Sequence, residues 1–311
     1  MIMMYQKLVV PIDHGNRNMK TENNIFTSGY VESDCKPALG EYLYYQGHYY
    51  TLSHQRIPYM RDKTADERFF ILSLFAIAME AKDRIITPDT ILRVELPVGL
   101  PPKHYGSLYQ KFEEYFQNRG VQNFSYKGRE LKVEISEAVA FPQDYAAAMT
   151  QYKEIKDYAK VITVDIGGVT LDYMLIRNGQ PDMSVCDSLE KGVIPMYNKV
   201  ISRIRNEYDT LLEEMDVDSI IQDKKTDFPE EIISIVKSEI KTYVDDILGT
   251  LRESGLDLKT GCVVFIGGGA KLLRKYLENS DRIGHSIFIE DICANAKGYG
   301  LLYQIQKRKG R

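Results

Sequence analysis

The stretch VITVDIGGVTLDYM, residues 161–174, predicts the element around which this chain is organised. Four β-prone residues lead to Asp165, the glycines Gly167 and Gly168 follow, and a second apolar run begins at Leu171. This order is typical of a β-hairpin with a glycine turn. Glycines at the tip can adopt positive φ and bring backbone N–H groups close to an anion such as phosphate. Because the carboxylate of Asp165 would repel that phosphate, the pair indicates an intervening Mg²⁺. A plain structural hairpin explains the stretch equally well.

A second stretch repeats the pattern near the start of the chain. Residues 8–20 read LVVPIDHGNRNMK, an apolar strand that ends in Asp13, His14 and Gly15, with Lys20 after the turn. The repetition predicts two related lobes, each offering a phosphate-binding hairpin to a shared cleft. Lys20 would add a cation within reach of a bound phosphate. A solvated surface lysine is the alternative interpretation.

A third stretch, residues 261–278, reads GCVVFIGGGAKLLRKYLE. It predicts an apolar strand, three consecutive glycines and an amphipathic helix. Three glycines allow a ligand to lie directly on the backbone. The pattern is not the dinucleotide-binding fingerprint, because the third required glycine is missing, and the chain contains no Walker A sequence. Each motif is weak by itself, but the three in this order form a specific constellation.

In this order the motifs resemble the actin, sugar kinase and heat-shock chaperone superfamily of ATPases, and within it the bacterial actin-like proteins of the ParM type, which segregate plasmids. IDHGNRNMK resembles phosphate loop one, TVDIGGVTLD phosphate loop two, VVFIGGGAKLL the adenosine loop, and VAFPQDYAAAM and CANAKGYGLLYQ the two connecting segments. The resemblance implies an α/β, two-lobed actin-like (ribonuclease H-like) fold with a nucleotide cleft between the lobes. Domain I would comprise residues 1–159 plus 293–311, and domain II residues 160–292.

The resemblance also implies a site for ATP, or GTP, with Mg²⁺. Asp13 and Asp165 would hold Mg²⁺ through its waters, since this ion dehydrates reluctantly. Gln143, in the first connecting segment, would orient the attacking water together with Asp165. The remaining nucleotide contacts would come from the three loops and from the residues before a later helix: Asp13, Gly15, Asn16, Asn18, Lys20, Gly167, Gly168, Val169, Thr170, Glu190, Lys191, Gly192, Gly267, Gly268, Gly269 and Ala270.

The identity of the water-orienting residue predicts the rate of hydrolysis. Many ParM-type proteins have glutamate at this position, whereas actins have glutamine. Gln143 is a poor proton acceptor, so strong general-base catalysis is not expected and a slow, timer-like hydrolysis is. Glu137 on the preceding strand is either an exposed strand residue or an assistant to Gln143. Asp172 faces either solvent or the phosphate loop, and it is not assigned a catalytic role.

Composition excludes several classes of function. A chain of 311 residues is long enough for about two domains. The formal net charge of −4 and pI near 5.8 argue against direct binding to nucleic acid. The four cysteines lack the C-x-x-C spacing of metal and redox sites. No signal peptide and no apolar run of ~20 residues is present, so a cytoplasmic protein without membrane contact is expected.

Periodicity and turn signals predict most of the elements. A capping box at residues 64–67 predicts a helix that runs to Lys82, and Pro97 is expected to end a strand that begins at Ile91. Residues 143–160 are expected to form one helix that crosses between the lobes. Residues 216–227 are expected to be a loop with a short strand, followed by a long helix from Pro229 to Ser254. Tight hairpin turns are expected at 46–47, 127–128 and 178–179.

Four functions are compatible with these features. The first is a filament-forming ATPase that assembles head to tail and moves plasmid DNA through a DNA-binding adaptor protein. The second is a small-molecule kinase of the same fold, although no extra carboxylate or histidine constellation indicates its acid or base. A chaperone-like ATPase would need a peptide-binding domain after the ATPase unit. A nucleotide sensor without hydrolysis remains open, because Gln143 does not accept protons.

Overall fold

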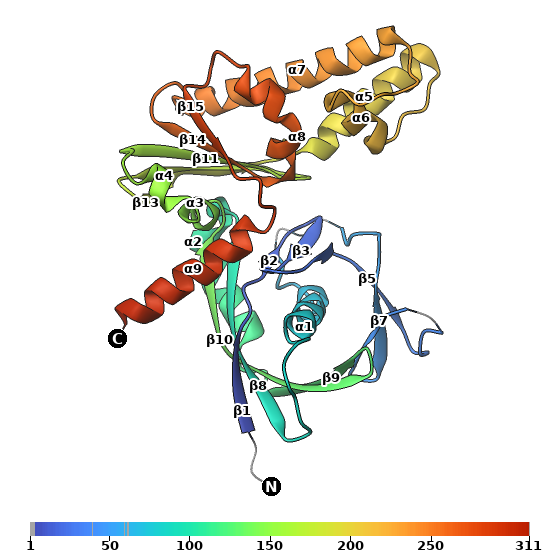
Figure 1. The fold of residues 1–311 in the computed structure, drawn as a ribbon, viewed down its shortest axis with the longest axis vertical. Coiled ribbons are helices and arrows are strands. Elements are labelled where there is room, and N and C mark those ends of the chain that lie inside the picture. Colours follow the sequence, from blue (N-terminus) through green and yellow to red (C-terminus); the bar gives the residue numbers. More distant parts are fainter. Residues whose placement is uncertain (1–3, 39, 59, 61, 311) are drawn as a thin grey trace. The chain divides into compact units, whose positions relative to one another are not determined.

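The structure is a computed structural model that describes residues 4–38, 40–58, 60 and 62–310. It is a mixed α/β protein, as the sequence predicts (Figure 1). The chain divides into two compact units. The first unit is Met1–Thr150 with Cys293–Arg311, and the second is Gln151–Ile292. The division therefore falls after residue 150, nine residues before the expected boundary.

The first unit is built on a mixed sheet with the strand order β1-β8-β10-β9-β6-β7-β5. Strand β8 lies in the parallel part of this sheet, between β1 and β10. A small antiparallel sheet, β2-β3-β4, carries the first Asp-x-Gly motif. The bounds are β1 Met4–Val9, β2 Asp13–His14, β3 Asn18–Lys20, β4 Ile25–Thr27, β5 Tyr30–Ser33, β6 Leu43–Tyr45, β7 His48–Leu52, β8 Thr90–Leu100, β9 Val121–Tyr126 and β10 Arg129–Pro142.

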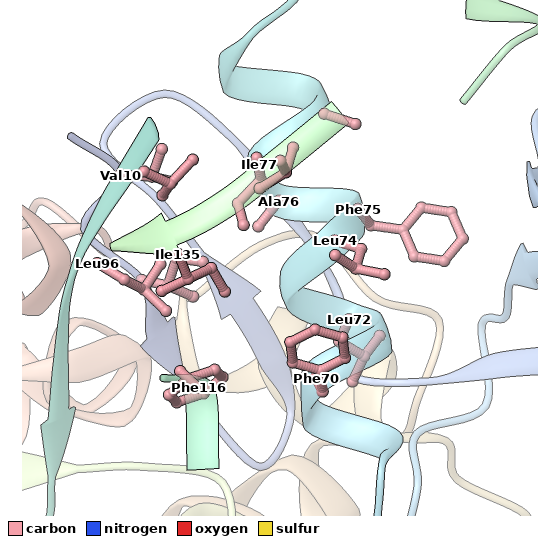
Figure 2. Packing of buried hydrophobic residues seen from close by; sticks show 14 of the residues in the cluster. Val10, Phe70, Leu72, Leu74, Phe75, Ala76, Ile77, Leu96, Phe116 and Ile135 are labelled. Atoms are coloured by element: carbon pink, nitrogen blue, oxygen red, sulfur yellow. The ribbon is translucent and has the colours of Figure 1, made fainter. Parts of the chain in front are cut away.

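Helix α1 (Arg68–Glu80) forms the centre of the first unit's core. Its residues from Phe69 to Ala78 are buried on every side, which is the pattern of a fully enclosed helix. Figure 2 shows Phe70 and Phe75 on this helix, together with Val10, Leu96 and Ile135 from other elements of the same cluster. The predicted capping box is wrong. The helix begins at Arg68, because the Thr64 hydroxyl donates to Asp62 Oδ1 at 2.6 Å and belongs to a separate turn.

Two strands of the first unit are longer than expected. Strand β8 passes through Pro97 and ends at Leu100, so Pro97 does not end it. Pro97 remains in register with Val139, and its carbonyl accepts the N–H of Ile12 at 2.9 Å. The sequence predicts two separate strands, at 129–135 and 138–142, but β10 is one strand that bulges between Ile135 and Glu137. Helix α2 (Pro102–Phe116) begins with proline at its first position, where the missing N–H costs nothing.

The single helix expected at residues 143–160 is wrong. The structure has two short helices instead, α3 (Tyr145–Met149) and α4 (Tyr152–Ile155). Asp144 before α3 has φ 58° and ψ −55°, which is incompatible with a helix that starts at Gln143. The last helix, α9 (Ala294–Lys309), packs on α3 at very close range. A Cβ atom on Gly298 would lie 2.0 Å from the carbonyl oxygen of Ala146, so only glycine fits there.

The second unit contains a sheet with the strand order β13-β12-β11-β14-β15. Strands β11 and β12 form the predicted antiparallel hairpin, and β14 and β15 add in parallel. Among the described residues, no helix of either unit is long and apolar enough to cross a membrane. The bounds are β11 Lys160–Ile166, β12 Leu171–Arg177, β13 Gln180–Leu189, β14 Cys262–Ile266, β15 His285–Phe288, α5 Val193–Tyr208, α6 Glu214–Ile221, α7 Glu230–Glu253 and α8 Gly267–Glu278.

Helices α5, α6 and α7 gather on one side of the second unit (Figure 1). The long helix α7 was predicted correctly from its apolar stripe. The loop and short strand predicted at 216–227 are wrong, because α6 forms there. Glu213 and Asp216 make a reciprocal capping box, and a helical stripe that includes Val217 and Ile220 is buried. The three predicted tight turns are confirmed, with positive φ at both central residues of each: Gln46, Gly47, Lys127, Gly128, Asn178 and Gly179.

Candidate functional site

Three of the predicted site residues meet in the first unit at the carboxylate of Asp13. Strand pairing in the β2–β3 hairpin sets Asp13 opposite Lys20, and the ammonium of Lys20 lies 3.1 Å from Asp13 Oδ2. The side-chain amide of Gln143 donates to Asp13 Oδ1, also at 3.1 Å. Asp13 is 2% exposed and Gln143 8% exposed. A buried carboxylate is therefore held by a cation on one oxygen and by an amide on the other.

The backbone fixes the position of Gln143. Its N–H donates to the carbonyl of Leu100 at 2.9 Å, at the end of β8. The next residue, Asp144, donates its N–H to Asn295 Oδ1 at 3.0 Å, on α9. The candidate water-orienting residue is thus anchored to the sheet on one side and, through its neighbour, to the C-terminal helix on the other. Glu137 takes no part in this arrangement: its carboxylate accepts from Tyr303 and pairs with Lys307.

The first phosphate-loop candidate, residues 12–20 (loop one), is also held on its buried, inner side. The residues that hold it there were not indicated by the sequence. The carbonyl of His14 accepts a hydrogen bond from the ammonium of Lys63, which is 5% exposed. The carbonyl of Gly15 accepts from the hydroxyl of Ser28 at 2.5 Å. The His14 ring is buried and bonds Ser73 Oγ at 2.8 Å. Burial and the Lys63 charge hold the pKa of His14 well below its ordinary value, so the ring is neutral.

The remaining loop-one candidates lie on the same hairpin. Asn16 is partly exposed, and Asn18 pairs with Thr27 in the small sheet. A Cβ atom at Gly15 would lie 2.5 Å from the carbonyl oxygen of Asn18, which explains why glycine is needed in this turn.

Loop two caps a helix in the second unit. The N–H groups of Gly192, Val193 and Ile194 donate to the carbonyls of residues 169, 167 and 168, at 2.9, 3.1 and 2.8 Å respectively. These donors open helix α5, where amides need partners from outside the helix. A Cβ atom at Gly192 would lie 2.5 Å from the carbonyl oxygen of residue 168. Gly192 therefore allows loop two and α5 to pack backbone against backbone.

Gly167 does not use the positive φ that glycine permits. The turn closes through the Gly167 N–H, which donates to the carbonyl of Thr170 at 2.9 Å. The Thr170 hydroxyl donates to Asp172 Oδ2 at 3.0 Å. Asp172 is buried and faces the loop, which decides between its two sequence interpretations. Asp165 lies opposite it in the β11–β12 register.

The three glycines of the third motif do different things. Gly267 has φ 90°, and a Cβ atom there would lie 2.2 Å from Asp165 Oδ1, so this glycine makes room for the aspartate. A Cβ atom at Gly269 would lie 2.6 Å from the side chain of Ile166. Gly268 is exposed with open space around it. Helix α8 begins on these residues, and Ala270 is buried in its first turn. A helix N-terminus favours an anion.

Two candidates from the segment before α5 have other surroundings. The ammonium of Lys191 donates to Asp246 Oδ2 at 2.6 Å and to Thr250 Oγ1 at 2.9 Å, both on α7. Its carbonyl accepts from Tyr243 at 2.7 Å. Glu190 beside it is exposed. These bonds use two of the three N–H donors of the ammonium and tie Lys191 to α7.

The hairpin with aspartate in each α/β unit, together with the helix that starts on three glycines, defines an actin-like fold. A family model described as the N-terminal domain of actin like proteins matches residues 9–145, and one described as the C-terminal part of the archaeal actin homologue MreB-like matches residues 163–279. Together the two models match most of the chain, and both describe actin-like domains. No curated protein sequence matches it.

Solved structures agree with this fold over almost the whole chain. The archaeal actin homologue Ta0583 is 18% identical with a TM-score of 0.77, covering 96% of this chain and 99% of that one. The apo psk41 ParM protein is 15% identical with a TM-score of 0.71, covering 97% and 98%. A 15-stranded ParM filament from Clostridium botulinum is 17% identical with a TM-score of 0.73, covering 96% and 99%. At these identities the likeness establishes the fold.

Proposed function

We propose that the protein is an ATPase that forms filaments in a nucleotide-dependent way. The observation that carries the proposal is the buried Asp13 carboxylate held by Lys20 and Gln143. A buried carboxylate with a cation on one oxygen and an amide on the other has the donors that phosphoryl transfer to water requires. An ADP complex of the archaeal actin homologue Ta0583, 18% identical to this chain, also supports nucleotide binding.

Each residue has a definite role in the proposed reaction. Lys20 binds phosphate oxygens and neutralises charge that develops on them. Gln143 orients the attacking water with Asp165, and because an amide accepts protons poorly, hydrolysis is slow. The amides of loop two and of the α8 N-terminus bind phosphate oxygens.

The chemistry of the donor set fits Mg²⁺. Within the described residues, no group of three or more His, Cys, Asp or Glu side chains could hold a metal ion by itself. Mg²⁺ does not need such a cage, since it keeps several waters and binds through one or two carboxylates plus substrate phosphates. Asp13 and Asp165 would supply those carboxylates. When bound, Mg²⁺ would neutralise charge between the β- and γ-phosphates.

The filament part of the proposal rests on geometry as well as on the fold. Copies that bind head to tail through two different surfaces form an open helical polymer when the contact does not close into a ring. Hydrolysis would weaken that contact and limit filament lifetime. The net charge of −4 does not favour direct DNA binding, so a DNA-binding adaptor protein of a plasmid partition system is the proposed cargo link.

Hydrolysis is tested by phosphate release from ATP·Mg²⁺ with three proteins. The parent chain is expected to turn over slowly, Asp165→Ala to be inactive, and Gln143→Ala to have a lower kcat with nucleotide affinity largely intact. Equal turnover by Gln143→Ala and the parent would refute the role of Gln143. GTP in place of ATP tests the base preference.

Assembly is tested by light scattering and electron microscopy of the purified chain. Scattering should rise above a critical concentration on addition of ATP·Mg²⁺ and fall as nucleotide is consumed. A chain that stays monomeric with a non-hydrolysable nucleotide at high concentration, yet transfers phosphate to a metabolite, would instead be a small-molecule kinase.

A further inference from the structure

Loop one has a buried cation beneath it that is distinct from Lys20. Lys63 comes from the segment before α1, and its ammonium donates to the carbonyl of His14, between Asp13 and Gly15. The ammonium also lies over the ring of Phe69, 5.5 Å from its centroid. Lys63 is 5% exposed, and lysine is almost never so buried unless it is paired. Burying an ammonium group is costly, because it loses its hydration.

The bonds on the inner side of loop one determine where its amides point. In a trans peptide the C=O and the following N–H point in opposite directions. The His14 carbonyl points inward to Lys63, so the N–H of Gly15 points outward. The Gly15 carbonyl points inward to Ser28, so the N–H of Asn16 points outward as well. Two successive amides on one side of a turn make an anion-binding concavity.

The charge beneath loop one also favours an anion at these two amides. The buried ammonium adds a full positive charge behind the two amides, where water screens it little. The neighbouring His14 ring is neutral, and it contacts the rings of Phe69, Phe112 and Phe116. The lysine charge is therefore the cationic contribution from beneath the loop.

We propose that Lys63 is a positioning residue for a polyphosphate ligand: it turns the amides of Gly15 and Asn16 outward and supplies a fixed positive charge behind them. Ser28 has no charge, but its bond to the Gly15 carbonyl likewise turns the amide of Asn16 outward. This inference rests on the proposed nucleotide-binding function and adds a residue to it. A purely structural lysine would hold the loop but would not discriminate among ligands by their phosphate charge.

The test compares Lys63→Met, Lys63→Arg and Ser28→Ala in the full chain. Lys132→Met is the matched control, because Lys132 also donates to a backbone carbonyl, that of Pro88 at 2.7 Å, but on the exposed surface. Affinities for ATP, ADP and adenosine are measured by calorimetry in Mg²⁺ buffer at two salt concentrations. Melting temperatures without ligand report loop damage separately.

Lys63→Met is expected to lower the affinity for ATP about tenfold or more, to lower that for ADP by less, and to leave that for adenosine within about twofold of the parent. The reason is that the electrostatic attraction lost with the Lys63 charge grows with the charge of the ligand. Lys63→Arg, which keeps the charge, should recover most of the affinity for ATP. Ser28→Ala should lower the affinity for ATP about threefold, and Lys132→Met should bind ATP as the parent does. Equal losses for ATP and adenosine, or unchanged ATP affinity, would overturn the proposal.

Pyrophosphate with Mg²⁺, measured by its effect on melting temperature, separates this inference from the proposed function. If the parent binds pyrophosphate but not ATP, and Lys63→Met loses the pyrophosphate effect, the inference stands and the nucleotide function fails. If ATP binds with equal affinity to the parent and Lys63→Met, the inference fails and the function stands. If the parent binds neither ligand, both are refuted.

Discussion

The close packing of α9 on α3 can be tested by two identical substitutions with opposite expected effects. Gly106 and Gly298 are each the fifth residue of a helix, α2 and α9 respectively. A Cβ atom at Gly106 would have open space within 4 Å, whereas at Gly298 it would lie 2.0 Å from the carbonyl oxygen of Ala146 and 2.3 Å from the carbonyl carbon. Gly→Ala in an open helix position stabilises by about 1 kcal/mol. Gly106→Ala should therefore stabilise the protein.

Gly298→Ala gains the same helix propensity, but its methyl group must push the backbones of α9 and α3 apart. Overpacking of this kind costs about 1–3 kcal/mol and occasionally more, and a contact to backbone is at the upper end because no side chain can rotate away. The expected net loss is about 2 kcal/mol, or about 4–8 °C in Tm for a unit of this size. Thermal unfolding of both variants, followed by circular dichroism, measures the difference.

The same substitution has a functional consequence, because α3 follows directly after Gln143. Displacing α3 would loosen the anchor of Gln143 through Asp144 and Asn295. Turnover by Gly298→Ala is therefore expected to fall at a temperature where the protein is still folded, while Gly106→Ala keeps parental turnover. A Gly298→Ala protein as stable as Gly106→Ala would refute the close approach of the two helices.

Two further predictions concern single groups. Burial alone would raise the pKa of Glu137, but hydrogen bonds from Lys307 and Tyr303 outweigh it and hold that pKa below 4.5. The ionised Glu137 carboxylate therefore stabilises the folded protein above pH 4.5, and this stabilisation is lost as the pH falls through the lowered pKa. The Tm difference between the parent and Glu137→Gln should accordingly shrink in acid. Glu213→Ala removes one half of the capping box with Asp216 and should cost about 1 kcal/mol, with faster proteolysis in α6. Unchanged proteolysis would mean that the cap does not hold α6.

Local chemistry explains which elements could be predicted. The tight turns were predicted because a glycine, which tolerates positive φ, stands at the tip of each. Helix α7 was predicted because its apolar stripe repeats at helical spacing. The loop predicted in place of α6 failed because the capping box there uses Glu213 at the cap, where serine or threonine is the usual signal. The expected helix at 143–160 failed because Asp144 adopts a positive φ that no local pattern indicates.

The candidate site divides in the same way. The sequence by itself indicated the two aspartate hairpins and the strand–glycine–helix unit, because each lies within one short stretch whose turn chemistry is local. Only the tertiary structure brought Gln143 onto Asp13, 130 residues away, and placed Lys63 beneath loop one. Partnerships of this kind depend on how α1 and β8 pack against the hairpin. Packing is a property of the folded chain that no single stretch contains.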